Sequence, residues 1–306
     1  MTDVALALDI GGTKMAAALV DRRGNLQRRA QVPTPPTSGP GPKDAETLWQ
    51  TLVDLVQHVR EGAAGAGGAG GAASQVSIVA CGVGCGGPMS PGGEAVSPLN
   101  IRGWRGFPLR ERLRELAAVP TFVENDAKAL ALAEGWRGAA AGERDFIAMV
   151  VSTGIGGGIV LEGRLLGGRL GNAGHIGHVV VEPAGRPCAC GGRGCLEAEA
   201  SGTALAEITG HPAALAPPDV VERTGSLVGR AVASVVNLLD LPLAVVAGSV
   251  ALGFGDPFFA AAQREMELRC GLDFARGAKV VPGGLGDRGP LIGAGCVGWR
   301  GLEGTP

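Results

Sequence analysis

Short apolar runs separated by polar, glycine-containing segments open the chain. Val4–Leu8, Met15–Val20 and Leu26–Val32 each have the length and composition of a β-strand. The segments between them, Asp9–Lys14 and Asp21–Asn25, contain the glycine, asparagine and charged residues that favour turns. The pattern therefore predicts a strand meander that begins at residue 4.

A helical period replaces the strand pattern after the meander. Within Asp44–Glu61 the large apolar residues recur every three or four positions, at Leu48, Leu52, Leu55, Val56 and Val59. This single apolar stripe predicts an amphipathic helix that packs on the meander. Gly62–Ser74 consists almost entirely of glycine and alanine and is typical of a flexible linker, whereas Val76–Val83 is predicted to be a buried strand.

The same order of elements returns in the second half of the chain. A second meander is predicted from Asp145–Val151 to Gly158–Leu161, with Ser152–Gly157 as the connecting turn. An apolar helix that ends at Leu239 then leads to a buried strand at Leu243–Val246. Between the two halves we predict a helix, a strand and a second helix at Leu109–Leu116, Thr121–Val123 and Ala127–Trp136.

Two meanders, each followed by alternating helices and strands, indicate an α/β protein of two lobes. Ligands of such proteins usually bind in a cleft between the lobes. The length of 306 residues and a hydrophobic content of 45% suffice for two cores.

Charge and apolar run length exclude several partner classes. The chain has 27 basic and 29 acidic residues, a net charge of −2 and no long basic run, which excludes the electrostatic pattern of proteins that bind nucleic acid or anionic lipid. Its first residues, MTDVALALDIGGTK, include acidic residues where a signal peptide has basic ones, and no run approaches the ~20 apolar residues that cross a bilayer. We therefore expect a soluble cytoplasmic protein with small-molecule partners.

Glycine-rich turns occupy equivalent positions in the two meanders. The first could be a plain hairpin turn, but its bare amides, hydroxyl and cation also suit phosphate groups, and its aspartate suits Mg²⁺ held through water. The predicted nucleotide and Mg²⁺ residues of this turn are Asp9, Gly11, Gly12, Thr13 and Lys14.

The second turn offers hydroxyls and amides in Ser152–Gly158, where we predict phosphate contacts from Thr153, Gly154 and Gly156. The chain contains neither Gly-Lys-Ser nor Gly-Lys-Thr, and the second turn lacks the last glycine of a dinucleotide fingerprint. Both turns together favour a nucleoside triphosphate such as ATP.

Three cysteines and a histidine form the most specific local motif. His178, Cys188, Cys190 and Cys195 have the spacing His-x9-Cys-x-Cys-x4-Cys. Three thiolates and one imidazole complete a tetrahedral Zn²⁺ site with no position left for water, so the predicted zinc is structural rather than catalytic. The alternative is a set of unligated buried thiols.

Glu124-Asn125-Asp126-Ala127 lies where a predicted strand gives way to a predicted helix. Asn125 or Asp126 could simply cap that helix, because both residue types are common at this position. The alternative is a catalytic carboxylate.

At this point the chain resembles the ROK family of sugar kinases and related repressors. The resemblance is carried, in this order, by Asp9–Lys14, Glu124–Ala127, Ser152–Gly158 and Gly177–Cys195, and it spans nearly the whole chain. It implies the two-lobed, actin-like ATPase fold of hexokinases, with ribonuclease H-like lobes and a zinc knuckle. It also implies binding of ATP and a sugar, and assembly into a homodimer or a higher homo-oligomer.

The resemblance assigns roles to individual residues. Asp126 becomes the general base that accepts the proton of a sugar hydroxyl. The implied sugar contacts are Asn100, Asn125, Asp126, His178 and Glu197. Gly248 and Ser249, within Val246–Val250, correspond to the adenosine-binding segment. We expect a smaller lobe of residues 1–120 and 290–306, and a larger lobe of residues 121–289 with the zinc knuckle and the adenosine-binding segment.

One position departs from the glucokinases of this family. His175 stands where they usually carry a glutamate near the anomeric end of the sugar, and replacing an acceptor-only carboxylate by imidazole changes which substituents fit. Bacterial N-acetylmannosamine kinases resemble this chain here, because they share Gly-His-Ile-Gly-His. His175 therefore favours an amino or N-acyl hexose.

The leading hypothesis is ATP-dependent phosphorylation of a hexose or hexosamine at the 6-hydroxyl, with N-acetylmannosamine or glucose as leading substrates. Mannose and kanosamine stay open as alternatives, because side chains unseen in the sequence distinguish these sugars. A second class is a sugar-sensing ROK protein without catalysis. The repressors of the family carry a winged helix-turn-helix before the first phosphate turn, and only eight residues precede Asp9.

Overall fold

Two compact units make up the chain. The computed structural model describes residues 2–37, 39–64 and 76–304. The first unit comprises residues 1–136, 167–173 and 287–306, and the second comprises residues 137–166 and 174–286.

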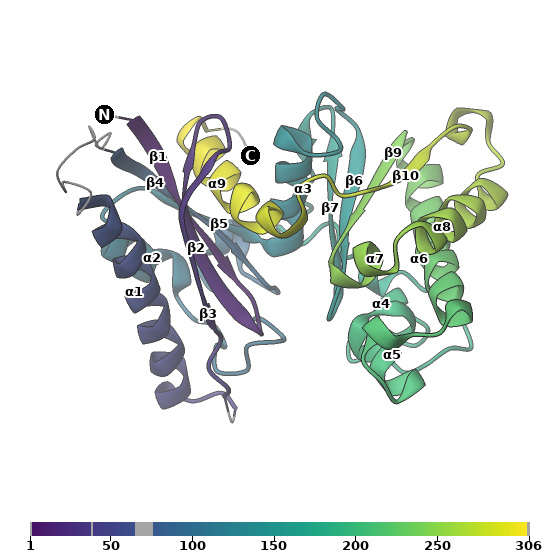
Figure 1. Cartoon of the computed structure of the whole chain (residues 1–306), viewed down its shortest axis with the longest axis horizontal. Helices are drawn as coiled ribbons and strands as arrows, with labels where there is room; N and C mark the ends of the chain where they lie inside the picture. Colours follow the sequence, from purple (N-terminus) through teal and green to yellow (C-terminus); the bar gives the residue numbers. More distant parts are fainter. Residues whose placement is uncertain (1, 38, 65–75, 305–306) are drawn as a thin grey trace. The chain divides into compact units, whose positions relative to one another are not determined.

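The first unit is built on a five-stranded mixed sheet with the order β3-β2-β1-β4-β5 (Figure 1). Its strands are β1 (Thr2–Ile10), β2 (Lys14–Asp21), β3 (Leu26–Pro33), β4 (Val76–Cys85) and β5 (Thr121–Asn125). The first three strands are antiparallel, as the predicted meander requires, and β4 and β5 run parallel to β1. Because β5 pairs with β4, residues 121–136 belong to this unit, beyond the boundary that we expected at residue 120.

Helices cover both faces of the first sheet (Figure 1). The helices of this unit are α1 (Pro42–Ala64), α2 (Leu109–Ala117), α3 (Asp126–Arg137) and α9 (Gly289–Leu302). The predicted apolar stripe of α1 packs in one core with Leu6, Leu8 and Ile10 of β1. On the opposite face, Ala7 and Ala18 pack against Leu291 and Ala294 of α9. The linker predicted at Gly62–Ser74 lies outside the described residues from residue 65 on.

The second unit repeats this connectivity. Its sheet has the order β10-β9-β6-β7-β8, with three antiparallel strands followed by two strands parallel to the first. Its strands are β6 (Phe146–Val151), β7 (Ile155–Leu161), β8 (Arg164–Leu165), β9 (Leu243–Ala247) and β10 (Lys279–Pro282). The recurrence predicted from the sequence is therefore present as two sheets of the same topology.

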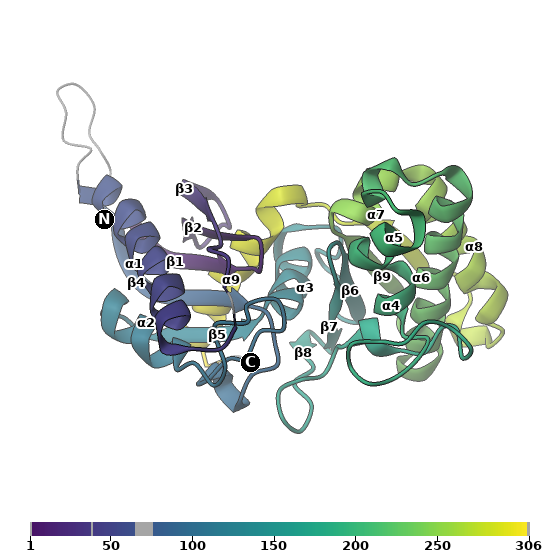
Figure 2. The ribbon, with the colours of Figure 1, turned by 90° about the horizontal axis from the view of Figure 1, so that it is seen from below.

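The helices of the second unit are α4 (Leu196–Ala200), α5 (Gly202–Thr209), α6 (Pro218–Leu239), α7 (Ser249–Phe254) and α8 (Asp256–Arg269). Figure 2 shows α6 and α8 side by side, and both contribute apolar residues to the core beneath the sheet. Single turns of 3₁₀-helix occur at Pro91–Gly93, Ile176–His178, Ala213–Leu215, Asp273–Ala275 and Gly286–Arg288.

The second glycine turn is shorter than predicted. Strand β7 begins at Ile155, so only Ser152–Gly154 connects β6 to β7, and Gly156 pairs with Val150 inside the ladder. The remaining glycines of the run lie inside β7, where a neighbouring segment packs directly on the strand. A Cβ at Gly157 would be 3.1 Å from Ile176 Cγ2. Close packing, rather than turning, explains the glycine run.

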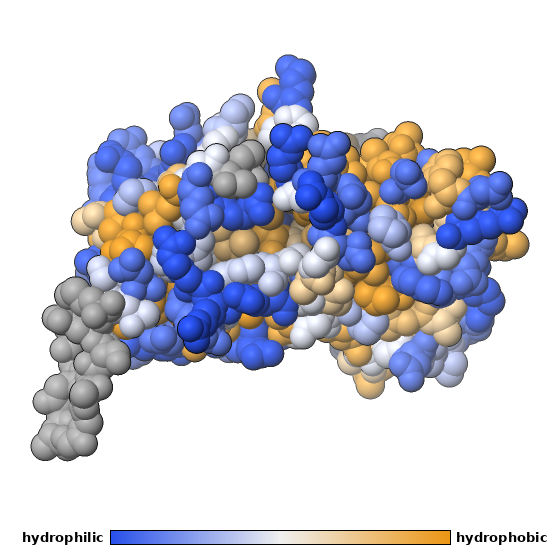
Figure 3. All heavy atoms as spheres, turned by 90° about the horizontal axis from the view of Figure 1, so that it is seen from above, coloured by the Kyte–Doolittle hydropathy of each residue, from blue (hydrophilic) through white to orange (hydrophobic). Residues whose placement is uncertain are grey.

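The surface is mixed in character. Figure 3 shows hydrophilic and hydrophobic residues interspersed over the face that it presents. Among the exposed large apolar residues of the second unit, Leu238 lies near the end of α6, and Leu268, Leu272 and Phe274 lie at or just after the end of α8. In the described ranges, no helix combines the length and the apolar character that crossing a membrane requires.

Candidate active site

The predicted catalytic carboxylates gather at one edge of the first sheet. Strands β1, β4 and β5 are parallel, so their carboxyl ends meet, which is where α/β proteins place ligands. The register aligns Asp9 with Gly84 and Glu124, and it aligns Cys85 with Asn125. Asp126 follows directly as the first residue of α3.

Asn125 and Asp126 have different surroundings at the start of α3. The side-chain oxygen of Asn125 accepts hydrogen bonds from the N–H groups of Ala127 (3.1 Å) and Lys128 (3.3 Å), which is a helix cap. Asn125 is therefore a helix cap, and Asp126 Oδ1 also accepts a hydrogen bond from the N–H of Ala127 (2.8 Å). Asp126 is exposed, and a Cβ at Gly86 would lie 4.0 Å from its Oδ2.

Burial and a neighbouring negative charge both raise the pKa of Asp9. Burial together with the neighbouring Asp126 carboxylate raises the pKa of Asp9 from 3.8 to about 7, and Lys14 and Arg29 only partly oppose this shift. Burial, Asp126 and Asp9 also raise the pKa of the Cys85 thiol well above its usual value. A carboxylate whose pKa is raised by burial and by a second carboxylate is in an environment that favours a cation.

The first glycine turn is closed by its own backbone and braced by β3. The N–H of Gly11 donates to the carbonyl of Lys14 (3.0 Å), and Thr34 Oγ1 donates to the carbonyl of Gly11 (2.7 Å). A Cβ at Gly12 would lie 2.6 Å from the Cβ of Asn100, so glycine is needed for this close approach. The structure thus brings the predicted sugar contact Asn100 against the predicted phosphate turn. Sequence reasoning missed Thr34, which carries no motif signal.

The second glycine turn is braced from two helix starts. The N–H of Ser152 donates to the carbonyl of Gly154 (3.0 Å), and Thr203 Oγ1 at the start of α5 donates to the carbonyl of Thr153 (3.0 Å). The hydroxyls of Ser152 and Ser249 are 2.9 Å apart.

Gly248 lies just before α7 with φ +101°, and its Cβ would clash with the carbonyl of Val151. The predicted adenosine-binding segment therefore adjoins the second turn.

Glu197 and the two histidines approach the same part of the second unit. Glu197 Oε2 accepts a hydrogen bond from the N–H of Ile155 (2.9 Å), the residue that follows the turn. The rings of His175 and His178 are 6.2 Å apart, and His175 is exposed. A Cβ at Gly177 would collide with the carbonyl of Ile155, so glycine lets the histidine segment lie on β7.

The four predicted zinc ligands converge. The ligand atoms of His178, Cys188, Cys190 and Cys195 all lie within 4.8 Å of one another. Cys188 Sγ is 3.7 Å from His178 Nδ1, and Cys190 Sγ is 3.7 Å from Cys195 Sγ. Thiolates 2.3 Å from a tetrahedral zinc would be separated by about 3.8 Å. The donor set and its spacing therefore fit this ion.

Backbone turns bring the cysteines of this cluster close together. The N–H of Cys188 donates to the carbonyl of Gly192 (2.8 Å), and the N–H of Gly192 approaches Cys190 Sγ (3.4 Å). This N–H lowers the pKa of Cys190, whereas burial raises the pKa of Cys195 to about 12. A bound cation would favour the thiolate form of all three sulfurs.

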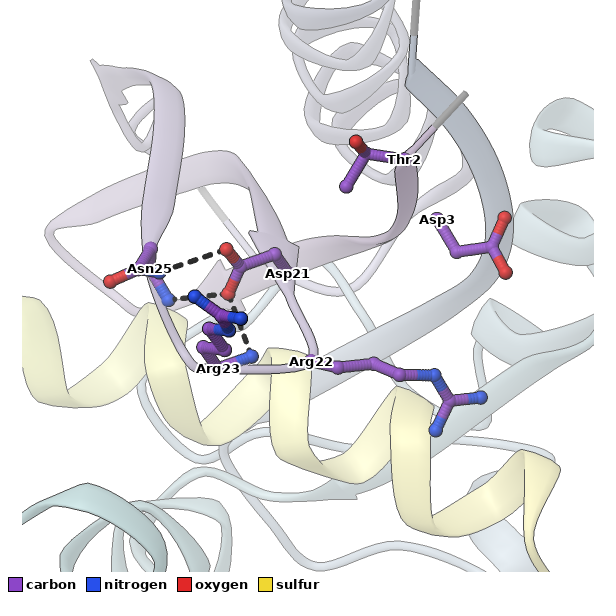
Figure 4. A pocket seen from close by; sticks show the side chains of 6 residues that line it. All are labelled: Thr2, Asp3, Asp21, Arg22, Arg23 and Asn25. Carbon is purple, nitrogen blue, oxygen red and sulfur yellow. Dashed lines mark hydrogen bonds between the residues drawn. The ribbon is translucent and has the colours of Figure 1, made fainter.

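A shallow pocket at the other end of the first sheet offers no comparable chemistry. It is lined by Thr2, Asp3, Asp21, Arg22, Arg23 and Asn25 (Figure 4). Asp21 accepts hydrogen bonds from Asn25 Nδ2 (2.8 Å) and from the backbone N–H groups of Asn25 (2.9 Å) and Arg23 (2.8 Å), and together these bonds lower its pKa. This carboxylate therefore serves to stabilise the turn that follows β2.

Known proteins resemble this chain over most of its length. The sequence profile described as the ROK family matches residues 5–297. The N-acetylmannosamine kinase of Citrobacter koseri is 37% identical over 265 residues, which cover 82% of this chain and 84% of that protein.

Solved structures show the same fold. The ROK hexokinase from Thermus thermophilus is 32% identical with a TM-score of 0.81, and the match covers 99% of this chain and 100% of that one. A ROK family glucokinase from Streptomyces griseus, solved with glucose and AMPPNP, is 27% identical with a TM-score of 0.80, covering 97% and 99%. With two mixed sheets of repeated topology and a family match along nearly its whole length, the chain belongs to the ROK family.

Proposed function

We propose that this chain is an ATP-dependent sugar kinase that phosphorylates a hexose or N-acylhexosamine at the 6-hydroxyl. The observation that carries the proposal is the group formed by Asp126, Asn125 and Asp9 at the carboxyl edge of the first sheet. Membership of the ROK family and 37% identity to an N-acetylmannosamine kinase support the reaction class.

Asp126 is the general base of the proposed reaction. Its carboxylate accepts the proton of the sugar 6-hydroxyl while that oxygen attacks the γ-phosphorus of ATP and ADP leaves. Asn125 keeps its amide N–H₂ group for the sugar, because its oxygen caps α3. The further proposed sugar contacts are Asn100, His175, His178 and Glu197.

The nucleotide contacts follow from the two glycine turns. In the first unit we propose that the amides of Gly11 and Gly12, the Thr13 hydroxyl and the Lys14 ammonium bind phosphate oxygens. In the second unit we propose the same role for Thr153 and Gly154. Gly156 lies beside them in β7, where the absence of a side chain would leave room for a phosphate group. Gly248 and Ser249 would contact the adenosine.

Mg²⁺ is the proposed metal of the reaction. Asp9 fits this ion, because burial and, after it, the neighbouring Asp126 carboxylate raise the pKa of its carboxyl, and a divalent cation would offset both effects. Mg²⁺, when bound, neutralises charge that develops on the transferred phosphoryl group.

A structural Zn²⁺ is the proposed occupant of the His178 and cysteine cluster. Its protein ligands fill all four positions, so this ion takes no part in the chemistry. Coordination through His178 Nδ1, the atom near Cys188 Sγ, would leave Nε2 for a sugar hydroxyl.

The substrate class depends on His175. We propose an N-acyl or amino hexose, with N-acetylmannosamine first and glucose second, because the exposed His175 imidazole can donate or accept a hydrogen bond. Other ROK sugar kinases, such as those for mannose or kanosamine, are the alternatives. The cytoplasmic location and the homodimer or higher oligomer stay predictions.

The proposal is tested by sugar-dependent ADP release from the purified chain. The panel should contain N-acetylmannosamine, N-acetylglucosamine, glucose, mannose and kanosamine, each with ATP and Mg²⁺. We expect the highest kcat/KM with an N-acyl or amino hexose, and His175→Glu should shift the ranking towards glucose. Absence of sugar-dependent ADP across the panel would refute the kinase and favour a sugar-sensing protein, which binding calorimetry on the same panel would detect.

A further inference from the structure

A nearly fully buried ammonium group lies beside the proposed catalytic residues. The side chain of Lys128, on the first turns of α3, is 2% exposed. Its Nζ is 3.0 Å from Glu124 Oε1 and donates a hydrogen bond to the carbonyl of Gly171 (2.9 Å). Burying an ammonium is costly unless its charge and its hydrogens are satisfied, so this arrangement depends on both partners.

The carboxylate partner connects Lys128 to the proposed sugar and base residues. Glu124 Oε1 also accepts a hydrogen bond from the N–H of Asn125 (2.8 Å), and Asn125 in turn caps α3. The ammonium therefore fixes a carboxylate that itself orients the backbone immediately before Asp126.

The carbonyl partner belongs to a compact loop, residues 167–173, which we call the anchored segment. The N–H of Ala173 donates to the carbonyl of Gly167 (3.0 Å), which joins the two ends of the segment. Asn172 Nδ2 donates to the carbonyl of Leu170 (3.0 Å) within it. The anchored segment lies with the first unit, while the chain on both sides of it lies with the second.

The anchored segment leads directly into the proposed sugar-contacting histidines. His175 follows the end of the anchored segment by two residues, and His178 follows by five. Gly171 is thus a point at which the stretch leading into the proposed sugar-contacting histidines is fixed to the helix that carries the proposed base.

We propose that Lys128 is a positioning residue that secures the anchored segment to α3 and thereby sets the affinity for the sugar. The inference rests on the proposed kinase function. Lys128 touches neither sugar nor nucleotide in this role. It acts through Glu124, which orients Asn125, and through Gly171, which leads to His175.

Limited trypsin digestion tests the anchoring independently of activity. Arg169 is exposed inside the anchored segment, so release of the segment should speed cleavage of the bond after it. We expect Lys128→Met to raise the rate of this cleavage about tenfold or more, measured by mass spectrometry. Lys43→Met, at an exposed position of α1, is the matched control and should leave the rate unchanged. An unchanged rate in folded Lys128→Met would overturn the anchoring.

Steady-state kinetics test the consequence for the sugar. Lys128→Met should raise the sugar KM about tenfold, with the ATP KM within twofold of wild type, because a small displacement of sugar contacts weakens that ligand alone. Lys128→Arg, which restores a buried cation, should recover part of the affinity. A fall in kcat of about tenfold, with the KM for sugar and the KM for ATP both unchanged, would overturn the positioning role.

Two more conservative variants test the proposal if Lys128→Met does not fold. Lys128→Gln keeps a donor for Gly171, and Glu124→Gln removes the carboxylate charge while keeping an acceptor. Both should show the same direction of change in trypsin cleavage and sugar KM, and wild-type values in both would refute the proposal. A wild-type enzyme that phosphorylates no sugar on the panel would refute the proposed function instead, whereas the digestion experiment would still decide the anchoring.

Discussion

The two glycine turns occupy the same place in two sheets of identical connectivity, yet they carry different chemistry. The turn between β1 and β2 is flanked by a carboxylate and an ammonium, Asp9 and Lys14, and lies near a second carboxylate, Asp126. The turn between β6 and β7 is shorter and presents hydroxyls and amides, with Ser249 and Thr203 beside it. Topology alone therefore creates two glycine turns at equivalent places, and the side chains around each turn differ in charge.

This difference predicts that substitutions near the first turn reduce turnover, whereas those near the second turn weaken nucleotide affinity. Charged groups act on the developing charge of a transition state, while neutral donors mostly contribute binding.

Asp126→Asn should lower kcat by about 10³-fold or more, because the amide cannot accept the proton of the sugar hydroxyl. The dissociation constant for the sugar, measured by calorimetry, should stay within about twofold of wild type, since shape and hydrogen bonding are largely kept. Asp3→Asn, an exposed aspartate of the same unit, should leave kcat unchanged. A kcat for Asp126→Asn near that of wild type would remove Asp126 as the base.

Asp9→Asn should lower activity strongly and weaken Mg²⁺ dependence, yet stabilise the metal-free protein at alkaline pH. The folded-state pKa of Asp9, about 7, lies above its ordinary value of 3.8, so the native state binds the extra proton between these values. Stability conferred by the protonated form is full below pH ~4 and is lost as pH rises through ~7, by at most about 4 kcal/mol at 1.36 kcal/mol per pH unit.

Thermal melts of the metal-free proteins at pH 5 and pH 8 measure this prediction. The wild type should lose more stability than Asp9→Asn between the two values. Equal losses in both proteins would show that Asp9 is not the group responsible.

Cys190→Ser should remove the proposed zinc and, through Glu197, disturb the second glycine turn. We expect about one zinc per chain in the wild type, measured by elemental analysis, a lower content in the variant and a melting temperature lower by at least about 5 °C. The KM values should rise, because Glu197 lies two residues after Cys195 and accepts a hydrogen bond from the N–H of Ile155, which follows the second turn. Cys270→Ala, at a buried thiol outside the cluster, is the control for zinc content.

Ser249→Ala should have the smallest effect, a rise in the ATP KM of about two- to fivefold with kcat nearly unchanged. The substitution removes one hydroxyl that pairs with Ser152 at 2.9 Å, and a single neutral hydrogen bond contributes about 0.5–1.5 kcal/mol. Initial-rate measurements at saturating sugar give both constants. A large fall in kcat would contradict the division of roles between the two turns.

The sequence predicted the meanders and the site motifs because their signals are local. Alternating apolar strands, a helical stripe in α1 and the His–Cys spacing can each be identified within a short window. The ligand atoms of that spacing do converge in the structure.

Features that depend on close packing were missed or misplaced. α9 was not predicted, because glycines such as Gly293 and Gly295 lower its helix propensity. Those glycines are needed because a Cβ at Gly295 would lie 2.6 Å from Val20 Cβ on the sheet. The same reasoning explains Gly157 in β7, and no local pattern reveals that Lys128 meets Gly171.

The position of α9 in the chain has a consequence for biosynthesis. All of the second unit is translated before Gly289–Leu302, whereas the sheet face of the first unit formed by Ala7, Ala16 and Ala18 is covered by that helix. A nascent chain lacking its last turns would expose an apolar sheet surface at the ribosome. We therefore expect the second unit to acquire its core first, and the proposed catalytic carboxylates to reach their final positions only when the last helix docks.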